Sequence, residues 1–138
     1  MGAYRLPDQW TIRLEYTRPP TGLSLNDRPH WATKSRNTAM VRNDVFVKVR
    51  AAKVPALERI AVFVTWYVFD GRTRDSDNPA PLLKAIYDGI GANRGISARI
   101  VEDDSPEYMD KRGLTIERAP GKGNPFFEVR IVDMGDAA

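Results

Sequence analysis

Residues 60–69 constrain the fold of this chain most strongly, because they form an apolar run rich in Val, Phe, Trp and Tyr. β-Branched and aromatic residues favour strands, and a short run of this kind indicates a strand buried in a sheet. The run leads into the charged segment Arg72-Thr73-Arg74-Asp75-Ser76-Asp77-Asn78. The sequence therefore predicts a buried strand that delivers a charged loop to the C-terminal edge of a sheet.

The charged loop holds two carboxylates, Asp75 and Asp77, and two arginines, Arg72 and Arg74. On extended backbone, side chains two residues apart point the same way, so the carboxylates can share one divalent cation. The arginines can hold an anion beside that cation. Cleavage of a phosphodiester needs this combination, although an exposed turn followed by a helix cap would account for the same residues.

A helix is predicted after the loop, with Asn78 as its N-cap and Pro79 at its first helical position. Gly89 and Gly91 weaken its last turn, which predicts an end near Ala92. Four apolar residues fall on one stripe that would face the core: Leu83, Ile86, Tyr87 and Ile90.

Lys84 and Asp88 are neighbours four residues apart on the flank of this predicted helix. The ammonium group of Lys84 would lie about one helical turn from the charged loop, close enough to orient a water molecule or a phosphate oxygen. A lysine and an aspartate at this spacing are also common as an ordinary surface pair.

A second acidic segment, Val101-Glu102-Asp103-Asp104-Ser105-Pro106-Glu107, contains a Ser-Pro turn signal. Like charges at this density repel one another unless a cation or arginines offset them, which gives a reason to fold them towards the first pair. Either Asp103 or Asp104 is therefore a candidate third metal ligand. A solvated loop is the plainer interpretation of the same acids.

Basic residues gather in a different part of the chain. Between Arg28 and Lys53 there are seven Lys or Arg residues against the single acid Asp44, whereas residues 102–110 hold five acids. A basic segment for the DNA backbone and a separate acidic pocket for metal would suit a nuclease, although a solvated helix face would also explain the cations. The predicted DNA-binding residues of this segment are Arg28, Lys34 and Arg36.

The basic segment is predicted to form a helix from about Thr33, because Val41, Val45, Val49 and Ala52 lie along one stripe. By propensity alone, residues 45–49 could instead form a strand. Trp31 is expected to pack as a lid rather than to stack on a base, and Trp10 and Trp66 are expected in the core.

The composition narrows the class of protein. A chain of 138 residues is long enough for one domain, and no linker divides it, so residues 1–138 are expected to fold as a unit. Cysteine is absent and His30 is the single histidine, which excludes disulfides and cysteine- or histidine-based metal clusters. No apolar run approaches the length of a membrane span, and no signal peptide is recognisable, so a cytoplasmic location without membrane contact is expected.

Three further strands are predicted at residues 9–17, 114–118 and 126–132, and residues 134–138 are expected to be a frayed tail. The predicted order is β-α-β-α-β-β. It indicates an α+β domain in which helices pack on one side of a mixed sheet.

Three blocks of this sequence resemble the RusA family of Holliday junction resolvases. They are the Arg-x-Arg-Asp-x-Asp-Asn segment at residues 72–78, the Lys-Ala-Ile-Tyr-Asp segment at 84–88, and the Asp-Asp pair at 103–104 before a strand. The Pro-Pro and Asn-containing stretch at residues 19–31 is similar to the opening of phage members of the family. Five residues separate Asn78 from Lys84, more than in better-known members, which displaces the lysine by most of a turn.

The resemblance implies a RusA-like fold and a Mg²⁺-dependent endonuclease that acts as a homodimer on four-way DNA junctions, with Mn²⁺ as a possible substitute. By resemblance, the catalytic metal ligands are Asp75, Asp77 and Asp104, and Asp103 is a second choice of metal ligand beside Asp104. Lys84 matches the essential lysine of the family. Arg72 and Arg74 match basic residues near the scissile phosphate. If the chain is encoded by a phage or prophage, its location is the cytoplasm of the bacterial host.

The function predicted from the sequence is therefore resolution of Holliday junctions by paired symmetric nicks, in DNA recombination and repair. A second hypothesis is a non-catalytic protein of the same fold that binds branched DNA through its basic segment. A third, a metal-dependent hydrolase of nucleotides or other phosphate esters, is disfavoured because the sequence has no Gly-rich phosphate-binding loop.

Overall fold

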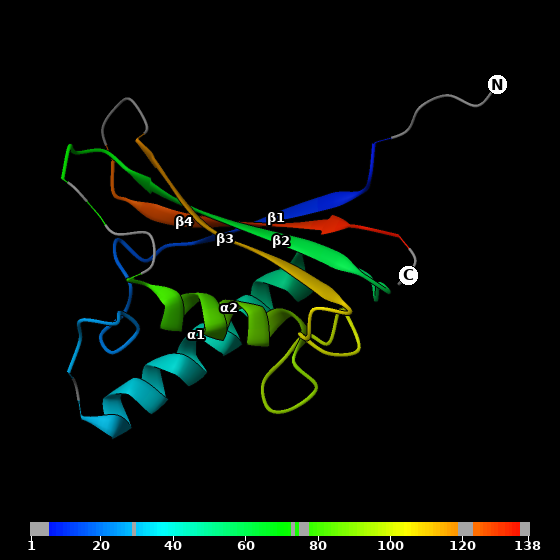
Figure 1. Cartoon of the computed structure of the whole chain (residues 1–138), viewed down its shortest axis with the longest axis horizontal. Helices are drawn as coiled ribbons and strands as arrows, with labels where there is room; N and C mark the ends of the chain where they lie inside the picture. The colour runs from blue at the N-terminus through cyan, green and yellow to red at the C-terminus, as the bar shows by residue number, and fades with distance from the viewer. Residues whose placement is uncertain (1–5, 29, 73, 75–77, 119–122, 136–138) are drawn as a thin grey trace.

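The predicted α+β class is confirmed by a computed structural model of the chain, which describes residues 6–28, 30–72, 74, 78–118 and 123–135. The element order is β1 (Gln9–Leu14), α1 (Trp31–Ala51), β2 (Ile60–Val68), α2 (Ala80–Gly91), β3 (Met109–Arg118) and β4 (Phe126–Asp133). The strands form one sheet in the order β1-β4-β2-β3, and both helices lie on the same face of that sheet (Figure 1).

The sheet is mixed because β2 and β3 run parallel while β4 is antiparallel to both β1 and β2. A parallel pair needs a crossover connection, and α2 supplies it between β2 and β3. The helix lies over the sheet and brings the chain back, so its C-terminal end and the loop of residues 92–108 are close to the beginning of β3 (Figure 1).

Alternate residues of the central strands face the helices and form the core. On β2 these are Ile60, Val62, Val64, Trp66 and Val68, all of them buried. On β4 they are Phe127, Val129 and Ile131, each with no exposed surface. A strand with one face packed against helices buries every second residue, which explains this period of two. The prediction of a buried strand at residues 60–69 is confirmed to within one residue, since β2 ends at Val68.

The predicted helix in the basic segment is confirmed, and the strand alternative for residues 45–49 is wrong. α1 begins two residues before the expected Thr33, and Nδ1 of His30 accepts a hydrogen bond from the backbone N–H of Ala32 at 3.2 Å. The stripe of Val41, Val45 and Val49 is completely buried. Tertiary packing of this stripe overrides the strand propensity of the valines.

The predicted start of α2 is wrong. The helix begins at Ala80, Pro79 is in the N-cap position, and no side chain caps the helix. Asn78 instead holds the 25–26 segment, since its side-chain Oδ1 accepts from the backbone N–H of Asn26 at 3.2 Å and its carbonyl accepts from that of Leu25 at 2.7 Å. The end of the helix agrees with the prediction, with Ala92 as C-cap.

The fates of the three tryptophans differ. Trp66 is buried and Trp10 is partly buried against the core, as expected. The expectation that Trp31 packs as a lid is wrong, because 76% of its surface is exposed. The buried residues of α1 begin only at Val41, so the N-terminal turns of the helix extend past the core and Trp31 does not pack against it.

No helix among the described residues combines the length and the apolar character that crossing a membrane would require.

Candidate functional site

A pair of opposite charges lies along α2. Nζ of Lys84 is 3.2 Å from Oδ2 of Asp88, one helical turn away. The two side chains differ in exposure, with 76% of the lysine side chain and 13% of the aspartate side chain accessible to solvent. Asp88 was expected on the flank of the helix, yet it is one of two buried polar residues in the described part of the chain.

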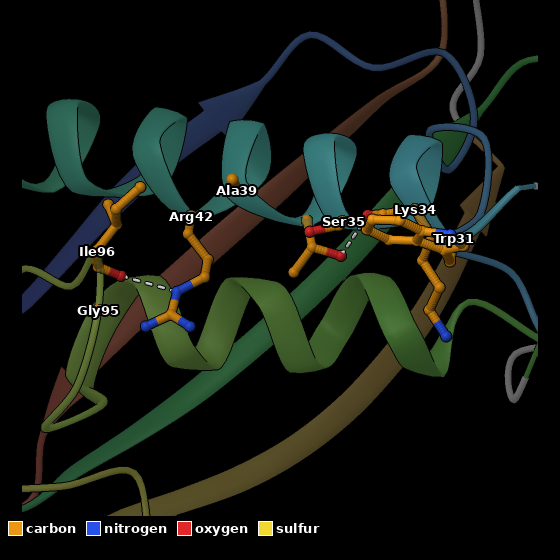
Figure 2. A pocket seen from close by; sticks show the side chains of 8 residues that line it. Trp31, Lys34, Ser35, Ala39, Arg42, Gly95 and Ile96 are labelled. Carbon is orange, nitrogen blue, oxygen red and sulfur yellow. Dashed lines mark hydrogen bonds between the residues drawn. The ribbon is translucent and has the colours of Figure 1, made fainter.

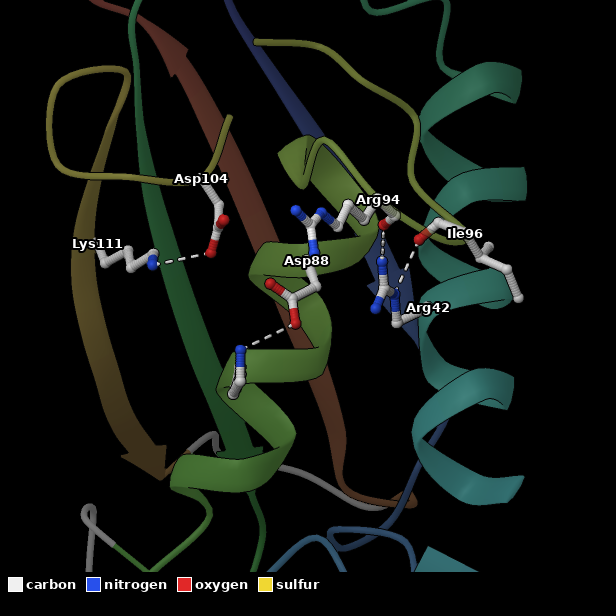
Figure 3. A network of polar contacts seen from close by, with 7 residues as sticks. Arg42, Asp88, Arg94, Ile96, Asp104 and Lys111 are labelled. Atoms are coloured by element: carbon white, nitrogen blue, oxygen red, sulfur yellow. Dashed lines mark hydrogen bonds and ion pairs between the residues drawn. The ribbon is translucent and has the colours of Figure 1, made fainter. Parts of the chain in front are cut away.

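Asp104 lies opposite this pair, in the loop before β3. Its Oδ2 is 3.0 Å from Nζ of Lys111, on β3, and the carboxyl groups of Asp88 and Asp103 are near neighbours that act on its pKa. Figure 3 shows Asp88 and Asp104 extending into the same space between α2 and β3, with Lys111 reaching towards Asp104 from the strand. The result is a cluster of four side chains, Lys84, Asp88, Asp104 and Lys111, which we call the acid-lysine cluster.

The environment of Asp104 favours its charged form. Burial raises the pKa of this carboxyl group, but the hydrogen bond and charge of Lys111 lower it, and the neighbouring Asp88 and Asp103 side chains add to this lowering. The net effect is a pKa below the usual value of 3.8. Asp104 is therefore ionised at neutral pH and can serve as an oxygen ligand for a cation.

The sequence left open which residue of the Asp103-Asp104 pair faces the site. The structure brings Asp104 to Asp88 and Lys111, whereas Asp103 contacts the cluster through Asp104. Asp103 is half-buried, and its charge also acts on the nearby Tyr108.

The other predicted ligands, Asp75 and Asp77, lie outside the described residues. Near them, Arg74 forms a two-pronged pair with Asp70, with N–O distances of 2.9 and 3.2 Å, and stacks over Trp66 at 5.2 Å from the ring centre. The hydrogen bond from Arg74 lowers the pKa of Asp70. Arg72 is exposed, and its backbone N–H donates to Asp70. Of the two predicted phosphate-binding arginines, Arg74 is held by Asp70 and Trp66, whereas no ion pair among the described residues holds the Arg72 side chain, whose charge also lowers the pKa of Asp70.

The predicted DNA-binding residues Arg28, Lys34 and Arg36 are all exposed, and no acid among the described residues forms an ion pair with them. Two other arginines of α1 have structural roles. Arg42 donates hydrogen bonds to the carbonyls of Arg94 and Ile96, and Arg50 donates to the carbonyl of Ala98. The surface cations of α1 thus separate into residues that hold the 94–98 loop and residues that are free to meet a ligand.

The cluster fits a magnesium ion in part. Within the described ranges, no group of three or more His, Asp or Glu side chains is arranged to hold a metal. Asp88 and Asp104 nevertheless supply two carboxylates at one point, and Mg²⁺ in proteins is often held by one or two carboxylates together with water and substrate phosphates. Lys84 and Lys111 currently satisfy these carboxylates, so a cation would have to displace one or both lysines.

Three residues of this region were missed from the sequence: Asp88 as a buried group, Lys111 and Asp70. The signal for Asp88 was available, because it is the one acid within the mainly apolar segment Leu82-Leu83-Lys84-Ala85-Ile86-Tyr87-Asp88-Gly89-Ile90. Lys111 gave no signal, since the strand was expected to start only at Leu114. Asp70 lies between the predicted strand and the charged segment, and no local pattern singles it out.

No known protein-family model matches this sequence, and no curated protein matches it. What the site can do therefore follows from its own geometry and charges.

Proposed function

We propose that this protein is a Mg²⁺-dependent endonuclease that resolves four-way DNA junctions as a homodimer. The observation that carries the proposal is the proximity of the Asp104 and Asp88 carboxyl groups beside the Lys84 ammonium group. Two carboxylates and an exposed lysine at one point are the groups that phosphodiester hydrolysis requires.

The two carboxylates have the role of metal ligands. Asp104 is ionised and Asp88 is held in place by the helix. Their oxygens lie between α2 and β3, where they could bind a cation. Asp75 and Asp77 precede the same helix in the chain and complete the proposed ligand set. Bound Mg²⁺ would polarise the phosphate and lower the pKa of the attacking water.

Lys84 has the role of a positioning and charge-neutralising group. Its side chain is 76% exposed, so the ammonium group can reach a bound phosphate while remaining close to the buried Asp88. A cation placed where negative charge develops stabilises the transition state. Arg72, exposed at the end of β2, would steady a neighbouring phosphate.

The test is cleavage of a synthetic four-way junction by the full chain in Mg²⁺. We expect Asp104→Asn, Asp88→Asn, Asp75→Asn, Asp77→Asn and Lys84→Met each to reduce the rate by about a hundredfold or more. The matched control is Asp110→Asn, which removes a partly exposed carboxylate that pairs with Arg112 at 3.1 Å, outside the acid-lysine cluster. Cleavage by Asp104→Asn at the rate of the unmodified protein would reject the site, and a lack of cleavage by the unmodified protein would reject the activity.

A second candidate is a non-catalytic protein that binds branched DNA. One observation favours it: each carboxylate of the cluster already has a lysine partner, so the cluster is neutral without a metal. This function predicts junction binding that is the same in Mg²⁺ and in EDTA and that survives Asp104→Asn. Charge reversal at Arg36 should weaken such binding, because Arg36 is an exposed cation without a structural partner among the described residues.

A further inference from the structure

A groove follows the outer surface of α1, on the side away from the sheet. It has a volume of about 510 Å³ and is lined by Trp31, Lys34, Ser35, Thr38, Ala39, Arg42, Gly95 and Ile96. Figure 2 shows Trp31 and Lys34 at one end of the groove and Ile96 at the other, with Arg42 between them. We call this hollow the Trp31 groove.

The indole ring of Trp31 is the most exposed large apolar side chain of the described residues, at 76%. Its only ring contact there is with the exposed His30, at 5.6 Å between ring centres. A tryptophan left in water forgoes the stabilisation that burial of its apolar surface would give. Folding of this chain therefore leaves a large flat aromatic surface available to a ligand.

The charges along the Trp31 groove are of one sign. Lys34 and Arg42 line it, and no acid does. Because Arg42 donates to the carbonyls of Arg94 and Ile96, Lys34 is the cation available to a ligand. Lys34 lies near the N-terminus of α1, where the helix dipole disfavours a positive charge, so helix stability does not explain its position.

The Trp31 groove borders a second hollow that reaches Lys84 and Asp88 of the acid-lysine cluster. This second hollow, of about 420 Å³, is lined by Leu25, Lys34, Thr38, Ala80, Pro81, Lys84, Ala85 and Asp88. Lys34 and Thr38 belong to both hollows. A chain lying along them would pass from the indole ring, past Lys34, to Lys84 and Asp88.

We propose that Trp31 and Lys34 bind an unpaired stretch of DNA, with a base stacked on the indole ring and an adjacent phosphate held by the Lys34 ammonium group. The occupant follows from complementarity, because an anionic strand with flat apolar bases matches a basic groove that ends in an exposed aromatic ring. The inference rests on the proposed function and adds which part of a branched DNA the protein holds beside its cleavage site.

The test uses the full chain in EDTA, so that binding is measured without cleavage. The probe is a fluorescently labelled oligothymidylate of about 15 nucleotides, a length within the usual site sizes for single strands. We expect Trp31→Ala to weaken binding about tenfold or more and Trp31→Phe to retain it within about threefold, since stacking needs an aromatic ring. Lys34→Met should weaken binding and reduce the dependence of log K on log salt by about 0.7.

The matched control is Val47→Ala, which removes another exposed apolar side chain of α1, 53% exposed, that lies outside both hollows. It should bind the oligothymidylate like the unmodified protein. Oligothymidylate should also quench tryptophan emission in the unmodified protein but not in Trp31→Phe, which keeps Trp10 and Trp66.

Unchanged binding by Trp31→Ala would overturn the inference. The inference would also be overturned if Trp31→Ala had the mass of a monomer, where the unmodified protein has that of a dimer, and bound oligothymidylate unchanged. The groove would then be a protein interface. A failed nuclease proposal gives a different result: the unmodified protein would leave four-way junctions intact in Mg²⁺ while still binding oligothymidylate through Trp31.

Discussion

The carboxyl group of Asp104 is a near neighbour of that of Asp88, although one is in a loop and the other is in the last turn of a helix. Two carboxylates in contact repel each other unless cations offset their charge. In this structure Lys84 and Lys111 offset it at distances of 3.2 and 3.0 Å. A divalent cation between the carboxylates would do so more strongly, because it binds both of them at once.

Mg²⁺ should therefore stabilise the folded protein through Asp88 and Asp104. A free Mg²⁺ concentration about a hundred times the dissociation constant raises the free energy of unfolding by about 2.7 kcal/mol. We expect the melting temperature of the unmodified protein to rise with Mg²⁺, and Asp88→Asn and Asp104→Asn to lose most of that rise. Calorimetric scans with Mg²⁺ and with EDTA measure it, and Asp110→Asn should respond like the unmodified protein. An equal rise in all four proteins would place the metal elsewhere.

The lowered pKa of Asp104 predicts a specific loss of stability in acid. Its pKa is lower in the folded state than in the unfolded state, so it contributes stability that is fully present above the unfolded value of about 3.9 and is lost as the pH falls through the folded pKa. Lys111→Met removes the main partner that lowers this pKa. The variant should be less stable than the unmodified protein at pH 7, and the difference in free energy of unfolding should shrink below about pH 4.

Urea unfolding of both proteins from pH 7 to pH 2.5 measures this difference, and carbon NMR of the Asp104 carboxyl group measures its pKa directly. Arg112→Met is the control, because it breaks a more exposed pair on the same strand, in which the arginine side chain is 51% accessible. A difference between Lys111→Met and the unmodified protein that stays constant down to pH 2.5 would show that the ion pair does not control the titration of Asp104.

Local sequence patterns predicted the elements of this fold well where the reason for the element is local. The run of β-branched and aromatic residues in β2 and the apolar stripe of α2 depend on residues within one strand or one helix. The run predicted the strand, and the helical spacing of the stripe predicted the helix. The N-cap prediction for Asn78 failed because its partner, Asn26, is 52 positions away in the chain. The predicted start of β3 at Leu114 was wrong for the same kind of reason. The polar residues that follow Met109 become a strand only by pairing with β2.

The candidate site shows the same division. The residue types and spacings of Lys84, Asp88 and Asp104 were visible in the sequence, but the proximity of Asp88 to Asp104 depends on the path of the 92–108 loop, which has no periodic pattern. Lys111 enters the site only because β3 begins early enough to carry it. Pairings of this kind are fixed by long-range packing, and a single sequence does not encode them in any local pattern.

Arg42 should contribute to stability rather than to DNA binding. Its guanidinium group donates to the carbonyl of Ile96 at 2.9 Å and also to that of Arg94, so it ties the 94–96 segment to α1. Hydrogen bonds from charged donors contribute about 1.5 to 3 kcal/mol, so Arg42→Met should lower the free energy of unfolding by about 2 kcal/mol. Arg36→Met, which removes an exposed cation of the same helix, should leave stability within about 0.5 kcal/mol.

Urea unfolding and junction binding in EDTA, measured on the same two variants, separate the roles. Arg36→Met should weaken junction binding with stability unchanged, and Arg42→Met should do the reverse. If Arg42→Met were as stable as the unmodified protein but bound the junction poorly, the assignment of Arg42 to loop anchoring would be wrong.

Gly89 should be required for the packing of α2 on α1, although glycine is a weak helix former. A Cβ atom at this position would lie 3.0 Å from the carbonyl oxygen of Arg42 and 3.0 Å from Cβ of Val45, closer than carbon atoms normally approach. Helix propensity alone predicts that Gly89→Ala stabilises the protein by about 1 kcal/mol. Because the clash involves backbone that cannot move without shifting α1, we expect destabilisation by about 1 to 3 kcal/mol instead.

Urea unfolding of Gly89→Ala shows whether the substitution raises or lowers the free energy of unfolding. In a double-mutant cycle with Val45→Ala, which removes Cγ1, 3.1 Å from the new methyl group, but keeps Cβ, the cost of Gly89→Ala should fall in part. A cost that stays the same would assign the clash to the Arg42 carbonyl and the Val45 Cβ atom.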